Sequence, residues 1–73
     1  MPKQSITKRD IEYLDIWSRG HENADVASAL GISIETVKSG SRRIFEKLKA
    51  ANRTEACVIA LSRGLIQLHR SEP

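Results

Sequence analysis

The sequence predicts an all-α domain of four short helices, bundle-like, with a central helix-turn-helix and no wing. Three observations support this prediction. Apolar residues recur at helical spacing in four segments, residues that favour helix starts precede those segments, and no sustained run alternates apolar and polar residues as a strand would. With 73 residues, the chain provides one small domain with a limited core.

The first helix is expected over about residues 8–19. Thr7 and Asp10 have the spacing of a capping box, in which Thr7 is the N-cap and Asp10 stands at the third helical position. Gly20 is placed to end the helix, because glycine readily takes the left-handed conformation that follows many helices.

The second helix is expected to be capped by Asn23 and ended by Gly31. Ser33 is then expected to cap a third helix almost at once. Its apolar stripe consists of Val37, Ile44 and Leu48, and the stripe continues through Gly40. The helix is therefore predicted to run unbroken past this glycine.

The fourth helix is expected to begin after Asn52 and to end at Gly64. Its inward side chains are expected to be Ala56, Ile59 and Ala60, with Leu65 and Ile66 folding back over them. The domain boundaries that follow are an N-terminal extension over residues 1–5, the helical domain over 6–66 and a frayed tail over 67–73.

The positive charge is concentrated in one part of the chain. The formal net charge is +3, yet residues 38–53 hold six basic side chains against one acidic side chain. A block of this kind suits phosphate and indicates a nucleic-acid partner. The alternative is an ordinary solvated helix face.

The second and third expected helices are joined by only Gly31, Ile32 and Ser33. Two short helices, a tight turn containing glycine and a basic second helix make a helix-turn-helix. In this motif the second helix enters the major groove of DNA while the first crosses the backbone. The sequence therefore predicts binding to double-stranded DNA.

Residues 6–66 resemble the LuxR-type (GerE-type) DNA-binding domain of bacterial transcriptional regulators. The family pattern includes I-S-x-x-T-V-K, N-R-T-x-A and G-L-I, each present here at the family's spacing. The matching residues are Thr7, Arg9, Glu12, Leu14, Gly20, Ala27, Leu30, Ile32, Ser33, Thr36, Val37, Lys38, Lys47, Leu48, Asn52, Arg53, Thr54, Ala56, Gly64, Leu65 and Ile66. The resemblance implies a four-helix fold, a third helix in the major groove, and dimers often formed through the fourth helix.

The resemblance also implies that bases are reached from Lys38, Ser39 and Arg42. Helical geometry supports this set independently, because these residues lie opposite the expected apolar stripe. Lysine and arginine donate to guanine O6 and N7, and serine contacts either a base or a phosphate. The alternative for all three is a solvated charged face.

Phosphate contacts are expected beside that set, from Thr36, Arg43 and Lys47 on a flanking face. Asn23 is a further candidate, because a helix N-terminus attracts phosphate, although it would serve equally as a plain cap. Arg9 is expected to pair with a neighbouring carboxylate rather than with phosphate.

Gly40 departs from the family pattern, which usually has histidine at this position. Glycine inside a helix costs about 1 kcal/mol relative to alanine. We expect Gly40 to lie on the flank of the third helix, where its missing side chain removes a contact to the DNA backbone. Two milder departures are Asp10, where the family has glutamate, and Ile34, at a position often polar.

A self-association surface is expected on the fourth helix. With the alanines inward, Cys57, Val58 and Leu61 are left partly outside, and an exposed apolar patch suggests a partner. Cys57 is equally well explained as a small buried apolar residue.

No enzyme is expected. His21 and His69 are far apart and lack cysteines or carboxylates at metal-ligand spacing, so neither a metal nor another cofactor is predicted. Tyr13 and Trp17 are interpreted as core residues, not as a platform for stacking bases. No apolar run approaches the roughly 20 residues of a membrane span, and the single cysteine suits a cytoplasmic protein.

The predicted function is sequence-specific binding of double-stranded DNA by a dimeric transcriptional regulator. RNA polymerase or a related regulator is considered as a further partner. The alternative is a stand-alone interaction module that forms heterodimers with a related regulator and inhibits it. Non-specific nucleic-acid binding through the basic block is a third interpretation.

Overall fold

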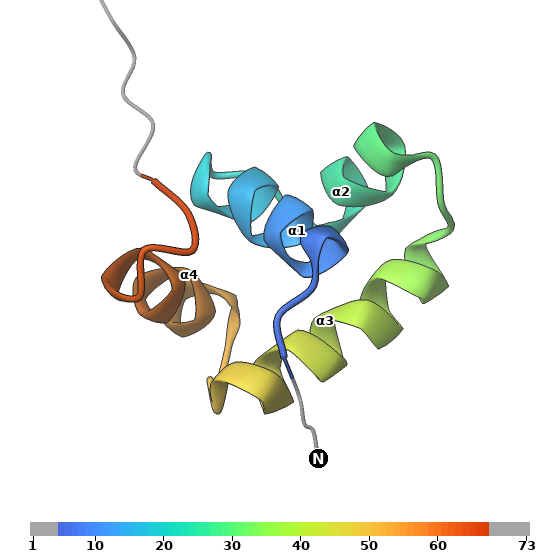
Figure 1. The fold of residues 1–73 in the computed structure, drawn as a ribbon. Coiled ribbons are helices and arrows are strands. Elements are labelled where there is room, and N and C mark those ends of the chain that lie inside the picture. The colour runs from blue at the N-terminus through green and yellow to red at the C-terminus, as the bar shows by residue number, and fades with distance from the viewer. Residues whose placement is uncertain (1–4, 68–73) are drawn as a thin grey trace, which may run out of the picture.

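The computed structural model describes residues 5–67, which form four helices in the order the sequence predicts (Figure 1). They are α1 (Lys8–Ser18), α2 (Asn23–Leu30), α3 (Ile34–Leu48) and α4 (Arg53–Ser62). These 63 described positions contain no strand. The expected extension over 1–5 and tail over 67–73 lie, apart from Ser5 and Gln67, outside the described residues.

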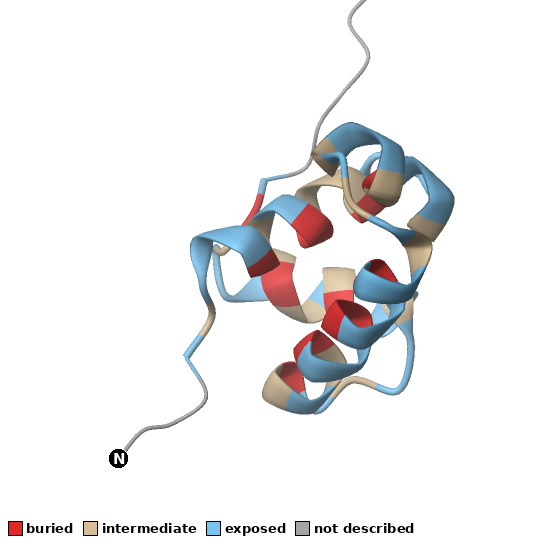
Figure 2. Ribbon diagram, turned by 90° about the vertical axis from the view of Figure 1, so that its right-hand side faces the viewer, coloured by how far each residue is buried: buried red, intermediate tan, exposed pale blue. Residues whose placement is uncertain are grey.

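The helix α1 lies at the centre of the fold and contacts α2, α3 and α4 (Figure 1). The longest helix, α3, runs beneath α1 and contacts the three other helices. Buried residues of every helix face the interior (Figure 2). The core consists of Tyr13, Leu14, Trp17, Val26, Val37, Ile44, Leu48, Ala56, Ala60 and Ile66. The expected apolar stripe of the third helix is thereby confirmed as core.

Three of the four predicted helix starts are confirmed. The backbone N–H of Asp10 donates to Thr7 Oγ1 over 3.1 Å, and the N–H of Thr7 donates to Asp10 Oδ2 over 3.0 Å, which completes the capping box. Ser33 Oγ accepts from the N–H of Thr36 over 3.1 Å at the start of α3. Asn52 caps α4 in the same way. Each contact satisfies an N–H group that has no partner within its own helix.

The cap predicted for α2 is wrong. The N-cap is Glu22, and Asn23 is already the first helical residue. The Oδ1 atom of Asn23 accepts the indole N–H of Trp17 over 3.0 Å. A buried indole N–H requires an acceptor, and this requirement directs the asparagine side chain toward α1.

The turn between α2 and α3 is as short as the sequence predicts. Gly31 has φ of 67°, a left-handed conformation that glycine adopts without a steric penalty. The N–H of Ile32 donates to the carbonyl of Ala27 over 3.0 Å, as in a Schellman motif. Ser33 then opens α3 directly, so the two helices form a helix-turn-helix.

No helix within residues 5–67 combines the length and the apolar character that crossing a membrane requires.

Candidate nucleic-acid interface

One side of α3 is open to solvent along the whole helix (Figure 2). Its exposed residues are Glu35, Thr36, Lys38, Ser39, Arg42, Arg43 and Glu46. The three residues implied as base contacts therefore share one exposed surface. This surface, which we call the α3 outer face, projects from the side opposite the core.

Three cations of the α3 outer face have no acidic partner. Lys38, Arg42 and Arg43 form no ion pair with any residue between 5 and 67. No ion pair within these residues therefore holds the three side chains away from a partner. Positive charge of this kind, on a convex helix, attracts the phosphates that border a DNA groove.

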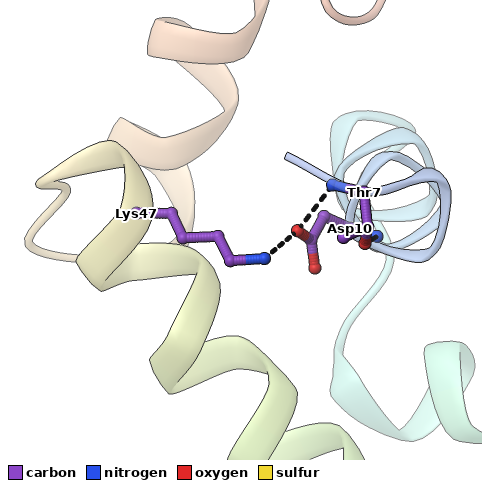
Figure 3. Close-up of polar contacts among 3 residues, drawn as sticks. All are labelled: Thr7, Asp10 and Lys47. Atoms are coloured by element: carbon purple, nitrogen blue, oxygen red, sulfur yellow. Dashed lines mark hydrogen bonds and ion pairs between the residues drawn. The ribbon is translucent and has the colours of Figure 1, made fainter. Parts of the chain in front are cut away.

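Lys47 is placed differently from these cations. Its Nζ lies 2.6 Å from Oδ2 of Asp10, and the side chain is only 15% exposed (Figure 3). The same carboxylate oxygen accepts the N–H of Thr7, so Lys47 joins the end of α3 to the capped start of α1. Lys47, which the sequence analysis predicts as a phosphate contact, thus places its charge in an interhelical contact with Asp10.

Asp10 keeps its negative charge despite its burial. Burial alone would raise the pKa of this carboxyl, but the hydrogen bond from Lys47, the N–H of Thr7 and the positive charge of Lys47 outweigh it. The pKa of Asp10 is lowered as a result.

The predicted position of Gly40 is wrong. Gly40 is buried and faces α1, not a flank beside DNA. A Cβ atom at this position would lie 2.5 Å from the hydroxyl oxygen of Tyr13. Tyr13 itself is 3% exposed, which confirms that it belongs to the core. The absence of a side chain at Gly40 makes room for Tyr13 of α1.

Thr36, Asn23 and Arg9 differ in their exposure and in their partners. Thr36 is exposed near the start of α3, where its Oγ1 is 2.9 Å from Oγ of Ser33. Asn23 is half-buried, and its amide oxygen is engaged by Trp17. Arg9 pairs with Glu12 over 3.3 Å, as the sequence predicts.

The three α4 residues expected at a self-association surface lie beside one another. Val58 is 58% exposed, whereas Cys57 and Leu61 are half-buried. All three line a shallow hollow of about 210 Å³ between α4 and the end of α1. Burial raises the pKa of the Cys57 thiol, against an opposing effect of Arg53, so the thiol stays protonated at neutral pH.

Three polar or steric contacts between helices were not predicted from the sequence: those of Lys47, Gly40 and Asn23. The buried carboxylate and the indole N–H each need a partner, but the sequence does not say which residue supplies it. Among residues 5–67, no group of three or more histidines, cysteines or carboxylates is arranged to hold a metal ion.

Comparison with known proteins identifies the fold's relatives. A model of the family described as bacterial regulatory proteins, luxR family, matches residues 4–60. The chain belongs to this family. The luxR family assignment confirms the resemblance seen in the sequence, and it makes the four-helix unit a helix-turn-helix DNA-binding domain of the kind found in transcriptional regulators.

Named relatives agree with the luxR assignment. The chain is 39% identical over 64 residues to the uncharacterized transcriptional regulatory protein YxjL of Bacillus subtilis, covering 88% of this chain and 29% of the relative. It is 38% identical over 64 residues to the response regulator protein VraR of Staphylococcus aureus, covering 88% and 31%. The chain thus spans about three tenths of the length of these relatives.

A solved structure supports the same assignment. The chain matches the crystal structure of the phage VqmA–DPO complex with a TM-score of 0.76 and 32% sequence identity. The match covers 86% of this chain and 29% of that one. The similarity is therefore confined to a domain-sized part of a larger protein.

Proposed function

We propose that this luxR-type domain recognises a specific sequence in double-stranded DNA by inserting α3 into the major groove. The observation that carries this proposal is the α3 outer face, where exposed cations lack acidic partners. Lys38 and Arg42 supply donors to guanine, and Ser39 lies between them in sequence. The domain performs no chemistry on DNA and acts by positioning.

The phosphate contacts are assigned to Thr36 and Arg43, which border the proposed base contacts. Lys47 is removed from this group, because moving its ammonium to phosphate would leave Asp10 buried without its cation. Asn23 is kept as a candidate for a phosphate contact, because it lies in the first turn of α2, where backbone N–H groups favour an anion.

Two copies are proposed to associate through Cys57, Val58 and Leu61. The exposed Val58 side chain supports this surface, since it leaves apolar area in contact with water. A two-fold dimer would place two α3 helices in successive major grooves, about 34 Å apart, and would read a pseudo-palindromic site.

The test begins with selection of duplexes from a random library, followed by titration of the enriched duplex by fluorescence anisotropy. Lys38→Ala and Arg42→Ala should each weaken binding by about 1–3 kcal/mol, or roughly 5- to 150-fold, and relax the preference at one base pair. Free energies of unfolding should stay within about 0.5 kcal/mol of the parent, because both side chains are exposed.

Arg63→Ala is the matched control for loss of one positive charge, because Arg63 is exposed at the end of α4, away from α3. Equal effects at Lys38, Arg42 and Arg63 would reject the groove assignment and leave non-specific attraction. If the library yields no enriched duplex but the domain forms an α4-dependent complex with a related regulator, the interaction-module alternative replaces the proposal.

A further inference from the structure

The three aromatic residues of the chain form one continuous row inside the domain. The rings of Tyr13 and Trp17 meet edge to face, with centroids 5.8 Å apart and planes at 88°. Trp17 also packs against Phe45 of α3, with centroids 5.7 Å apart. The row starts on α1 and ends on α3, so it fixes both helices on the same rigid side chains.

Gly40 leaves a notch in α3 at the free end of this row. A Cβ atom there would lie 2.5, 2.8 and 2.9 Å from three atoms of the Tyr13 side chain, its hydroxyl oxygen, Cζ and Cε2. Contacts below 3.0 Å are not tolerated, so either the ring or the helix would have to move. The ring has little freedom, because Tyr13 is 3% exposed and its ring also packs edge to face against Trp17.

The Tyr13 hydroxyl also reaches the backbone of α3. It lies 3.5 Å from the carbonyl oxygen of Thr36, one turn before Gly40, in a long hydrogen bond that it donates. Thr36 and Gly40 bracket Lys38 and Ser39, two of the proposed base contacts. The Tyr13 side chain therefore contacts the stretch of α3 backbone that carries Lys38 and Ser39.

We propose that Tyr13 is a positioning residue for α3, the proposed recognition helix, and that Gly40 provides the space that the Tyr13 ring occupies. In this proposal, contact between the phenol ring and bare backbone sets how far the first half of α3 projects from the domain. The inference rests on the proposed function, because it assigns the contact a role in DNA recognition. Any side chain at position 40 would push α3 away from Tyr13 and misplace Lys38 and Ser39.

The first test is the melting temperature of a double-mutant cycle. In the parent, Gly40→Ala should lower the melting temperature by about 4 °C or more, because the new methyl group meets the ring. With Tyr13→Val the ring is gone, and Gly40→Ala should then raise the melting temperature by about 4–8 °C, because alanine favours a helix over glycine. Tyr13→Leu is run in parallel as a second background with a larger residual side chain.

A reversed sign of the Gly40→Ala effect in either background supports the matched contact. The same sign in both backgrounds overturns it, because alanine would then be acting independently of Tyr13. This cycle needs no DNA, so it stands even if the parent proves to bind none and the proposed function fails.

The second test asks whether the contact positions α3 or only stabilises the domain. Binding of the selected duplex is measured at a temperature at which circular dichroism shows every variant folded. Gly40→Ala should weaken this binding at least about fivefold, which is the smallest loss of affinity expected when one base contact is removed. Ile66→Ala is the matched control, since it removes core volume in the segment after α4, where Ile66 lines a hollow with Ile11 and Glu12 of α1 and no residue of α3. Equal affinity of folded Gly40→Ala and parent would overturn the positioning role.

Discussion

The two sides of α3 use positive charge in opposite ways. The α3 outer face carries Lys38, Arg42 and Arg43 without an acidic partner among residues 5–67. On the side toward α1, Lys47 is enclosed and paired with Asp10. All four belong to one basic block of the sequence. The difference shows that charge density along a chain does not measure the charge that a partner can reach.

The largest effect should come from breaking the enclosed pair. Lys47→Met keeps most of the aliphatic stem but removes the ammonium, which leaves the buried carboxylate of Asp10 without its cation. The free energy of unfolding should fall by roughly 2–3 kcal/mol. Urea unfolding followed by circular dichroism measures this loss.

Arg43→Met is the matched control on the outer face of the same helix, and it should change the free energy of unfolding by less than about 0.5 kcal/mol. Equal losses from the two substitutions would contradict the contrast between the two sides.

Acid should weaken the same pair through Asp10. Its pKa in the folded domain is below its usual value of 3.8, so near that pH the folded state binds fewer protons than the unfolded state. The stability that the pair contributes is present at neutral pH and is lost as the pH falls from about 4 through the folded-state pKa. Thermal unfolding between pH 7 and pH 2 measures this loss.

In the acid series, Asp10→Asn is the informative variant, because it cannot titrate at this position. It should melt at a lower temperature at neutral pH and should lose less on acidification than the parent does. An identical acid dependence in the variant and the parent would remove Asp10 as a source of the effect.

The smallest effect on stability, but a distinct one on binding, is expected from the outer face. Arg43→Met should lower the slope of log affinity against log salt by about one unit, because one counterion fewer is released from phosphate. Lys47→Met should leave the slope unchanged. Titrations of a fixed duplex at four salt concentrations distinguish the two. A lower slope for Lys47→Met would return this lysine to the phosphate contacts.

The helices were predictable because their signals are local. Thr7, Ser33 and Asn52 satisfy N–H groups only three positions away, and Gly31 ends α2 through its own backbone conformation. The end of α3 lacks such a signal. There Lys49, not a glycine, adopts the left-handed conformation, with φ of 56°.

The contacts between helices were not predictable, because they depend on three-dimensional proximity. Asp10 and Lys47 are 37 positions apart, so nothing local connects the carboxylate to its ammonium. Gly40 has poor helix propensity, which signals a special position but does not name Tyr13 as the cause. Exposed candidates such as Arg42 follow from helical periodicity alone, and for that reason the outer face was predicted correctly as exposed.

The hydrogen bond from Trp17 to Asn23 has a practical consequence for studying this domain. Trp17 is the single tryptophan of the sequence, and it is 4% exposed. From its place on α1 it donates to Asn23 of α2 and packs against Phe45 of α3. One chromophore thus samples three helices of the DNA-binding unit at once. Its emission provides an unlabelled optical signal for folding and for displacement of α3.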